Sequence, residues 1–521
     1  MKSSLGGVLR ILALLFLGAA MLGGCGLPPM PERSASRALD AAEAAQTLLG
    51  RVLAPRLQRH PDRSGMHLLS DPLEAFAARM LLARAAQRSL DVQYYIWRGD
   101  QTGTLLLQAL LDAAERGVRV RLLLDDGGTG GLDRELAALA AHPNFEVRLF
   151  NPFALRWPKR LGYVTDFART NRRMHSKSFT ADNQASIVGG RNVGDEYFGA
   201  SDGVVFADLD VLAVGPVVQD VSAEFDRYWA SLSAWPVESI LPAADPAVLP
   251  ALSARALALA RSDAAQAYVQ ALRDTALIQD LLAGQLALHW SRVEMVSDDP
   301  AKVLQQATRS GHLLDQLHRA IGIPQRSVVL ISPYFVPTTA GTAALAHLRA
   351  RGVTVRVMTN AYEATDVPLV HGGYAKHRKA LLQGGVDLYE MRRSALAPGA
   401  ERGVNPNPLG SSGASLHAKT FAVDGERVFV GSFNFDPRSA LLNTELGFVI
   451  HSAEFARLIE RKFESEVPRR SYTLRLSEHG EVEWLDTAHT PPVVHTTEPN
   501  SRWWSRAMLR LLAWLPIDRL L

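Results

Sequence analysis

The chain carries two copies of a short motif whose residue types suit chemistry at a phosphate. In both copies the order is His-x-Lys, four residues, Asp, six residues and Gly, and the two copies begin at His175 and His417. An imidazole can attack phosphorus or protonate a leaving oxygen, and an ammonium can offset the charge that builds on the non-bridging oxygens. The motifs therefore predict one phosphodiester site that holds two histidines and two lysines and needs neither metal nor cofactor.

Each motif needs a strand to aim its side chains. Residues i and i+2 of a strand share a face, so His175 points with Lys177, and His417 points with Lys419. Asp182-Asn183 and Asp424-Gly425 are typical of hairpin turns, which gives the two aspartates mainly structural roles. The strands that follow lead into glycines, which allow close backbone approach. Two amides placed to donate hydrogen bonds to the site come next, Asn192 and Asn434.

A catalytic histidine also needs a carboxylate that fixes its tautomer. An aspartate at a hairpin tip does not reach its own histidine, so the candidates lie on the next strand of each half, Asp208 and Glu445. The candidate site residues are the motif residues and their supports. They are His175, Lys177, Asp182, His417, Lys419 and Asp424, supported by Asn192, Asn434, Asp208 and Glu445.

The sequence around the motifs is duplicated as well. Strand, helix and strand patterns occupy residues 90–96, 104–116 and 117–123, and again residues 328–331, 342–351 and 352–357. A glycine ends each helix, and this order predicts parallel strands in an α/β layer. The fold class expected is α/β, with two domains related by a pseudo-twofold axis and packed around a shared active site.

These patterns divide the chain into a duplicated body with additions at both ends. An Ala- and Leu-rich stretch from Ala243 to Gln305 is expected to be a helical connector, and Pro398 to Ser415 is expected to be a loop. The segments predicted are a signal peptide (1–25), an N-terminal linker or helix (26–65), the first domain (66–240), the connector (241–310), the second domain (311–475) and a C-terminal extension with an amphipathic helix (476–521).

Composition excludes several classes of protein. The 521 residues are 47% hydrophobic, which is typical of a globular chain and excludes a disordered chain or a polytopic membrane protein. The 56 basic and 53 acidic residues leave a net charge of +3, which excludes a nucleic-acid binder that works by bulk charge. The single cysteine, Cys25, excludes an intramolecular disulfide and a cysteine-based zinc site.

The N-terminus predicts export and attachment to a membrane. Lys2 and Arg10 give a positively charged start, residues 11–21 are an apolar stretch, and small residues stand just before Cys25. This pattern is typical of a bacterial lipoprotein signal peptide in which Cys25 is lipidated. The alternative is an uncleaved anchor helix, because residues 5–22 are nearly long enough to span a bilayer. Gly26 replaces the aspartate of the inner-membrane retention signal, which favours the outer membrane, with the protein facing the periplasm.

Two further segments suggest contact with lipid. Arginines at 502, 506 and 510 share one stripe of a predicted C-terminal helix, which is typical of a helix in the bilayer interface or of a terminal helix docked on the protein. A basic run leads into the first motif and is interleaved with aromatic residues. Its cations, Arg156, Lys159, Arg160, Arg169, Arg172 and Arg173, would contact anionic headgroups or form a solvated face.

The paired motifs resemble the HKD motif of the phospholipase D superfamily over roughly residues 68–466. More narrowly, residues 171–174, 189–198 and 436–439 resemble the cardiolipin synthases of the C type. The resemblance implies a two-step phosphatidyl transfer in which His175 becomes phosphorylated and His417 protonates the departing alcohol. With phosphatidylglycerol as acceptor the product is cardiolipin, and with water it is phosphatidic acid. The donor, phosphatidylethanolamine or a second phosphatidylglycerol, stays open.

Three functions compete on these residues. The first is a membrane-tethered phosphatidyltransferase that acts on phospholipids at an anionic membrane surface. The second is a hydrolase of phospholipid or nucleic acid, although nuclease relatives tend to be short chains with one motif, so no nucleic-acid partner is expected. The third is a catalytically inactive lipoprotein that binds lipid or a partner, and the intact histidines and lysines of both motifs argue against it.

Overall fold

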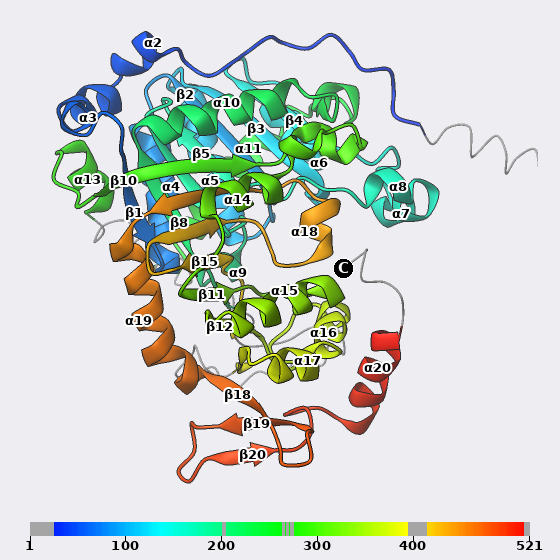
Figure 1. Cartoon of the computed structure of the whole chain (residues 1–521). Helices are drawn as coiled ribbons and strands as arrows, with labels where there is room; N and C mark the ends of the chain where they lie inside the picture. The colour runs from blue at the N-terminus through cyan, green and yellow to red at the C-terminus, as the bar shows by residue number, and fades with distance from the viewer. Residues whose placement is uncertain are drawn as a thin grey trace, which may run out of the picture.

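The structure, a computed structural model, describes residues 26–200, 205–262, 266, 270, 276–393 and 414–514. The predicted signal peptide and Cys25 lie outside the described residues. Figure 1 shows two α/β layers, one drawn in blue to green and the other in green to orange, with helix α19 (Ala453–Arg470) running along one side of both. The predicted α/β class with two similar halves is confirmed.

The first half is a mixed sheet whose centre carries the first motif. Strands β2 (Ser89–Ile96), β3 (Arg119–Gly128) and β4 (Phe145–Phe150) are parallel. On the other side of β2 the order continues antiparallel, through β5 (Ser178–Ala181), β6 (Ala185–Gly189), β8 (Asp210–Val214) and β1 (Ser64–Leu69). Helices α4 (Pro72–Ala85) and α5 (Gln101–Glu115) belong to the apolar core of this half.

The second half repeats this order. Strands β11 (Ser327–Ile331), β12 (Thr354–Asn360) and β13 (Asp387–Met391) are parallel. The antiparallel side then runs through β15 (Thr420–Val423), β16 (Arg427–Gly431), β17 (Leu446–His451) and β10 (His289–Ser297). Helices α14 (Leu313–Ile321), α15 (Thr338–Ala350) and α17 (Arg378–Gln383) pack in its core.

Strand β10 joins the two halves and corrects the expectation of a helical connector. It pairs antiparallel with β1 of the first half and with β17 of the second, so one sheet runs through both halves. Only α11 (Val248–Ala260) and α13 (Leu277–Leu282) are α-helices longer than one turn among the described residues of that stretch. The reason is local: Arg292 and Glu294 alternate with Val293 and Met295, which is the period of a strand.

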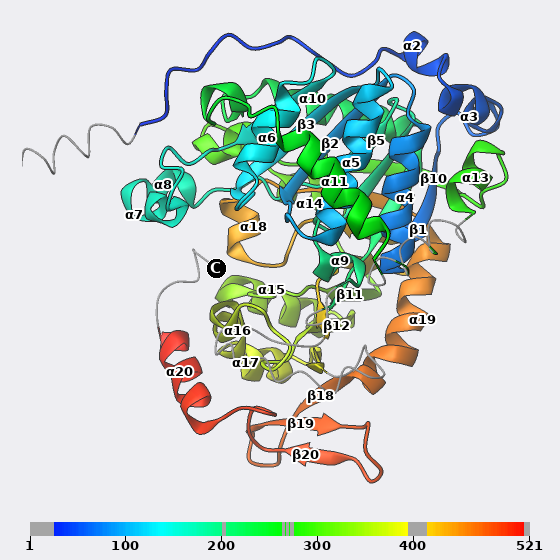
Figure 2. The same cartoon turned by 180° about the vertical axis from the view of Figure 1, so that it is seen from behind.

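A third apolar core lies between the halves. Residues of α10 (Pro216–Ala230) and α19 pack with residues from strands of both halves. In Figure 2, which shows the molecule from behind, α19 lies on the side away from the short helices α7 (Gly162–Thr165) and α8 (Phe167–Thr170). These two sides of the molecule therefore present different surfaces.

The remaining elements close the ends of the sheet and the loops around the site. They are α2 (Ala41–Ala45), α3 (Leu48–Arg59), α6 (Asp133–Ala140), η1 (Lys159–Leu161), α9 (Asp195–Phe198), β7 (Val205–Ala207), β9 (Ala234–Pro236), η2 (Val237–Ser239), η3 (Pro300–Leu304), η4 (Arg309–Gly311), α16 (Pro368–Ala375), β14 (Ala414–Leu416), α18 (Pro437–Leu441), β18 (Ser471–Leu476), β19 (Val482–Asp486), β20 (Val493–His495) and α20 (Trp503–Trp514). Within the described ranges, no helix combines the length and the apolar character that crossing a bilayer requires.

Candidate active site

The two motifs meet where the halves face each other. Each His-x-Lys segment is extended and lies immediately before a strand, β5 or β15, rather than within it as expected. The backbone amide of His175 donates to the carbonyl of Thr444 at 2.8 Å, and that of His417 donates to the carbonyl of Ala207 at 2.8 Å. Strand β7 also pairs in parallel with β14. Backbone hydrogen bonds therefore hold each motif against a segment of the other half.

The carboxylates that meet the two histidines come from opposite halves. Nδ1 of His175 lies 2.7 Å from Oε2 of Glu445, and Nδ1 of His417 lies 2.5 Å from Oδ2 of Asp208. The sequence predicts each carboxylate in the half of its own motif, whereas in the structure each one meets the histidine of the other half. The cause is the backbone contact just described, because Asp208 follows Ala207 and Glu445 follows Thr444.

This geometry sets the tautomer of both rings. A carboxylate accepts the hydrogen of Nδ1, which leaves the lone pair on Nε2 for an incoming phosphorus or proton. Both rings are almost fully buried, with 6% of His175 and 5% of His417 exposed. The site can therefore offer two oriented imidazoles that have little access to water.

The lysines are held beside their histidines. Nζ of Lys177 donates to the backbone carbonyl of His175, and Nζ of Lys419 donates to that of His417 at 2.5 Å. Nζ of Lys419 also lies 3.1 and 3.2 Å from the two ring nitrogens of His417. The ammonium groups thus sit where a phosphate bound between the histidines would carry its charge.

Burial beside these cations keeps the imidazoles neutral. Loss of hydration lowers the pKa of His175 well below its ordinary value, and Lys177 and Lys419 lower it further. Burial and then Lys419 lower the pKa of His417 to about 4, although Asp208 opposes this shift. Burial also lowers the pKa of Lys419 to about 8.

The two carboxylates differ in charge and surroundings. Burial raises the pKa of Glu445 to about 7. Burial opposes ionisation of Asp208 as well, but His417 and Lys419 outweigh it and hold the pKa of that carboxyl below its ordinary range. Asp208 is therefore the carboxylate that stays charged at neutral pH, whereas Glu445 exchanges its proton more easily.

The residue beside each carboxylate also differs between the halves. Burial raises the pKa of Glu445 against the opposing effect of its hydrogen bond from Ser432. A Cβ at Gly190 would lie 2.1 Å from Oδ1 of Asp208, so only glycine leaves room for that carboxylate. The corresponding residue of the second half is Ser432, whose hydroxyl donates to Oε2 of Glu445 at 2.5 Å. Ser432 is a site residue that the sequence pattern did not predict, and its signal is the serine that stands in the second motif where the first has Gly190.

Aromatic rings line both histidines and were not assigned to the site from the sequence. Tyr95 meets His175 edge to face, with centroids 5.0 Å apart, and lies under Nζ of Lys177 at 5.4 Å. Tyr197 and Phe206 lie against His417 at 5.2 and 4.9 Å. Nothing in the sequence around these rings distinguished them from ordinary core aromatics.

The two motif asparagines differ from each other in the structure. Asn192 accepts from the amide of Ile96 at 3.1 Å and donates to the hydroxyl of Tyr197 at 3.0 Å, so it orients a ring that touches His417. Asn434 is buried, and its amide oxygen has no hydrogen-bond partner among the described residues. Both side-chain amide atoms of Asn192 are therefore used in hydrogen bonds within the protein, whereas the amide oxygen of Asn434 can still accept one.

The motif aspartates bind backbone rather than histidine. The carboxylate of Asp182 accepts from the amides of residues 87, 88 and 89, where β2 begins. Asp424 accepts from the amides of residues 325, 326 and 327, where β11 begins. Both residues have positive φ, at 52° and 58°, as a tight hairpin turn requires. Although burial opposes it, this amide donation holds the pKa of Asp424 below its ordinary value.

We expect Asp182→Ala to destabilise the fold by about 2–4 kcal/mol, because several buried amides lose their acceptor at once. The rate per folded molecule should stay close to that of the parent chain. Asp182→Asn, which keeps one acceptor oxygen, should lose about half as much. Urea unfolding together with an assay of the folded fraction measures both effects, and a stable but inactive Asp182→Ala chain would contradict the structural role.

The basic run before the first motif is mostly paired within the protein. Arg156 binds Asp126 and Asp133, and Lys159 binds Asp126 at 2.8 Å. Arg169 pairs with Asp166, and the buried Arg173 pairs with Asp125. Arg156, Lys159 and Arg173 are therefore not a solvated face, because carboxylates distant in sequence pair with them. Contact of this run with anionic headgroups stays a prediction.

The C-terminal helix docks on the second half and still presents aromatic residues to solvent. Helix α20 packs against α16, with Ser505 and Leu509 buried. Trp503 is 75% exposed. The alternative of a terminal helix docked on the protein is therefore confirmed, and a place in the bilayer interface stays a prediction. His371 on α16 binds Glu498 at 3.0 Å and lies in this junction rather than at the site.

In the part of the chain that the structure describes, no group of three or more His, Cys, Asp and Glu side chains is arranged to hold a metal ion. The reactive groups available there are the two imidazoles, the two ammonium groups and the two carboxylates described above. They can perform nucleophilic attack at phosphorus with proton transfer to and from an oxygen.

Known proteins resemble the chain over nearly its whole length. The profile of the family described as "Cardiolipin synthase, PLD-like domain" matches residues 81–229 and 314–467, one match for each motif. The chain is 46% identical over 481 residues to "Cardiolipin synthase C" of Escherichia coli (strain K12), covering 91% of this chain and 99% of that one.

More distant likenesses agree in fold. A "Cardiolipin synthase" of Staphylococcus aureus (strain Mu50) is 25% identical over 417 residues, covering 79% of this chain and 70% of that one. The crystal structure of a phosphatidylserine synthase from Haemophilus influenzae Rd KW20 superposes with a TM-score of 0.57 at 13% identity, covering 90% of this chain and 100% of that one. This last match concerns the fold alone.

Proposed function

Because the chain belongs to the cardiolipin synthase family of phospholipase D-like proteins, we propose that it is a phosphatidyltransferase that makes cardiolipin from phosphatidylglycerol and a second phospholipid. The observation that carries the proposal is the pair of crossed contacts, in which each motif histidine meets a carboxylate of the other half at 2.7 or 2.5 Å. Two oriented imidazoles with an ammonium beside each are what a two-step transfer at phosphorus requires.

In the first step, Nε2 of His175 attacks the phosphorus of the donor lipid. The bond from phosphorus to the headgroup oxygen breaks, and His417 gives its proton to that oxygen. A phosphodiester between the lysines offsets their charge, which raises the pKa of His417 on binding and lets it carry this proton. The product is a phosphatidyl group bonded to His175 and a free headgroup alcohol.

In the second step, the acceptor hydroxyl of phosphatidylglycerol loses its proton to His417. Its oxygen attacks phosphorus, the bond from phosphorus to Nε2 of His175 breaks, and cardiolipin leaves. Both histidines return to their starting protonation. If water takes the place of the hydroxyl, the product is phosphatidic acid, so the exclusion of water from the buried site favours transfer over hydrolysis.

The carboxylates support this assignment of roles. Asp208 stays charged, so it stabilises an imidazolium at His417, as a general acid requires. Glu445 loses its charge more easily, and the pKa of His175 is lowered by burial and by both lysines, so His175 stays neutral as a nucleophile must. The two motifs are thus alike in sequence but differ in the carboxylate that each receives.

The test is an assay of the purified full chain on mixed vesicles. Labelled phosphatidylglycerol is supplied with and without phosphatidylethanolamine, and the lipids are separated after reaction. Accumulating cardiolipin supports the transferase, and its dependence on phosphatidylethanolamine identifies the donor. Phosphatidic acid alone would instead establish a hydrolase, and a chain that cleaves DNA but no lipid would overturn the proposal.

The membrane surface is the partner that the exposed aromatics favour. Trp157 is 84% exposed and Val164 is 80% exposed, both in the lobe that contains α7 and α8. In both views this lobe lies on the same edge of the molecule as α20, which carries the exposed Trp503 (Figures 1 and 2). Exposed tryptophans at one edge are typical of a surface that enters the bilayer interface. Tyr163 of this lobe meets Phe153 edge to face at 5.2 Å, and Phe153 lies under the guanidinium of Arg173, two residues before His175, which supports a position of this edge close to the site.

We expect the double variant Trp157→Ser, Val164→Ser to raise the KM for vesicle-borne phosphatidylglycerol roughly tenfold or more, because each fully buried apolar side chain contributes about 1.5–3 kcal/mol. The rate on a short-chain, monomeric substrate should not change. Leu257→Ser on α11, which is also an exposed apolar residue, is the control and should leave both rates unchanged. Equal loss on both substrates would contradict a role in membrane contact.

The tether completes the proposal. Residues 1–25 have the pattern of a lipoprotein signal peptide, so Cys25 would become a lipidated N-terminus in the cell envelope, facing the periplasm at the outer membrane. Incorporation of labelled palmitate, abolished in Cys25→Ser, tests this assignment. No label on the parent chain would favour an uncleaved anchor helix, and label that persists in Cys25→Ser would indicate acylation at another residue.

A further inference from the structure

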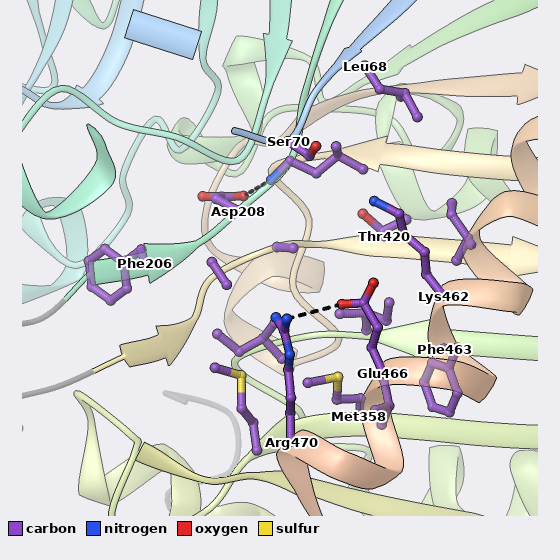
Figure 3. A pocket seen from close by; sticks show the side chains of 18 of the residues that line it. Leu68, Ser70, Phe206, Asp208, Met358, Thr420, Lys462, Phe463, Glu466 and Arg470 are labelled. Carbon is purple, nitrogen blue, oxygen red and sulfur yellow. Dashed lines mark hydrogen bonds and ion pairs between the residues drawn. The ribbon is translucent and has the colours of Figure 1, made fainter. Parts of the chain in front are cut away.

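An apolar cavity of about 500 Å³ lies beside the extended segment of the second half that carries His417 and Lys419. Figure 3 shows it between α19 on one side and Phe206 and Asp208 of the first half on the other. Side chains of Leu416, Ala418 and Thr420 line it, and these alternate along the chain with His417 and Lys419. Neighbouring residues of an extended segment point to opposite faces, so the cavity lies on the face opposite to His417 and Lys419, and it shares Phe206 and Asp208 with the active site.

The walls of the cavity are built from flexible and branched apolar side chains. Ile331, Met358 and Thr420 form one row across neighbouring strands of the sheet, and Met391 lies beyond them. Protein interiors are close-packed, and a cavity of this size with few polar partners gives water little to bind. Methionine adapts its shape to a flexible ligand. The lining therefore fits an apolar chain.

Helix α19 supplies both the inner wall and a charged rim. Ile459, Phe463 and Val467 recur every four residues and form a buried stripe that faces the cavity. A charged residue follows each of them three residues later. These charged residues form the next stripe of the helix and line the rim of the cavity: Lys462, Glu466 and Arg470 (Figure 3). The apolar interior thus opens beside two cations and one anion.

The rim has cationic capacity left for a ligand. Glu466 lies 3.6 Å from Arg470 and offsets that charge in part. Lys462 forms no ion pair with any residue that the structure describes, and its side chain is exposed. An anionic group at Lys462 would therefore meet a cation that has no ion pair among the described residues, while the chain attached to it filled the cavity.

From this arrangement we propose that the cavity binds the single acyl chain of a long-chain fatty acid, with its carboxylate at Lys462 on the rim. The volume lies within the range of small-ligand sites, 300–1,000 Å³, and the one apolar stripe of α19 forms a wall for a single chain. Helix α19 lies on the side of the molecule away from α7, α8 and α20 (Figures 1 and 2). This part of the proposal rests on the membrane edge proposed above, which leaves the cavity open to water. A single-chain amphiphile dissolves as a monomer far more readily than a two-chain phospholipid does.

The experiment is photolabelling of the full-length His175→Ala chain in its membrane with a palmitic acid that carries a diazirine near the end of its acyl chain. Because this variant cannot form the proposed phosphohistidine, labelling is independent of phosphatidyl transfer. Peptide mapping should find adducts on residues 459–467 and on the facing strands. Unlabelled palmitate should compete, and hexadecanol, which lacks the charge, should compete at least roughly fivefold less well.

Two variants and a control complete the test. Ile459→Trp fills the cavity and should remove these adducts. Lys462→Glu changes an exposed side chain, does not depend on repacking, and should lower the adduct yield roughly fivefold. Arg461→Glu places the same charge change on the neighbouring residue of α19, which does not line the cavity, and should label like the parent.

Several results would overturn the proposal. They are adducts that appear only on the lobe of α7 and α8, a yield unchanged by Lys462→Glu, or equal competition by hexadecanol. Adducts displaced by lysophosphatidylglycerol but not by palmitate would assign the cavity to a different ligand. The vesicle assay of phosphatidyl transfer is run separately, so failure of one proposal is distinguishable from failure of the other.

Discussion

Replacing His175 by alanine is expected to lower cardiolipin formation by about 10⁴-fold or more, because the reaction loses its nucleophile. The intermediate should disappear with it. When the parent chain is mixed briefly with a radiolabelled phosphatidyl donor and quenched in alkali, label should remain on the protein, since a phosphoramidate to histidine survives base better than acid. In His175→Ala no label should remain.

His417→Ala should fail at a different step. With a natural donor it too should lose about 10²–10⁴-fold, because the headgroup oxygen leaves without a proton. With a p-nitrophenyl phosphodiester, whose leaving group needs no proton, the variant should release nitrophenol once and hold the adduct on His175. The exposed His318 on α14 supplies a control, and His318→Ala should behave like the parent. An adduct in His175→Ala that is absent from His417→Ala would reverse the two roles.

The strands and the motif region could be predicted because their signals are local. Alternation along residues 90–96 and the repeated order of strand, helix and strand depend on side chains two to four residues apart, which a sequence displays directly. The turn at Asp182 could be predicted for the same reason, and its structural role follows from the positive φ that a hairpin demands. The duplication added a second reading of each element, since an assignment in one half could be checked in the other.

The contacts that cross between the halves could not be predicted in this way. The partners His175 and Glu445 are 270 residues apart, and nothing near either residue records which histidine the carboxylate meets. Lys159 likewise binds Asp126, a carboxylate 33 residues before it, so the charge of this lysine is paired within the fold although its neighbours in the sequence are basic. Strand β10 was wrongly expected to be helical. The Ala- and Leu-rich composition of the long stretch around it outweighed the short alternating pattern of the strand itself.

The crossing of the carboxylates gives Asp208→Asn and Glu445→Gln distinct expected phenotypes. Each should lower the transfer rate by about 10²–10⁴-fold, because a misoriented or wrongly protonated imidazole loses most of its acid–base function. They should differ in the step that is damaged. Since Asp208 meets the ring of His417, its amide variant should regain much of its first-step rate with the p-nitrophenyl donor, whereas Glu445→Gln should not.

Asp208→Asn should also change how the rate of leaving-group departure depends on pH. The carboxylate of Asp208 opposes the lowering of the pKa of His417 by burial and Lys419, so removing its charge lowers that pKa further. The protonated form of His417 then declines at a lower pH, and the alkaline limb of the rate of leaving-group departure should move to lower pH in Asp208→Asn. Asp208→Glu, which keeps the charge, should shift the limb less. If each carboxylate instead served the histidine of its own half, the two phenotypes would exchange, with Glu445→Gln rescued by the activated donor and Asp208→Asn not, and the crossed site would be wrong.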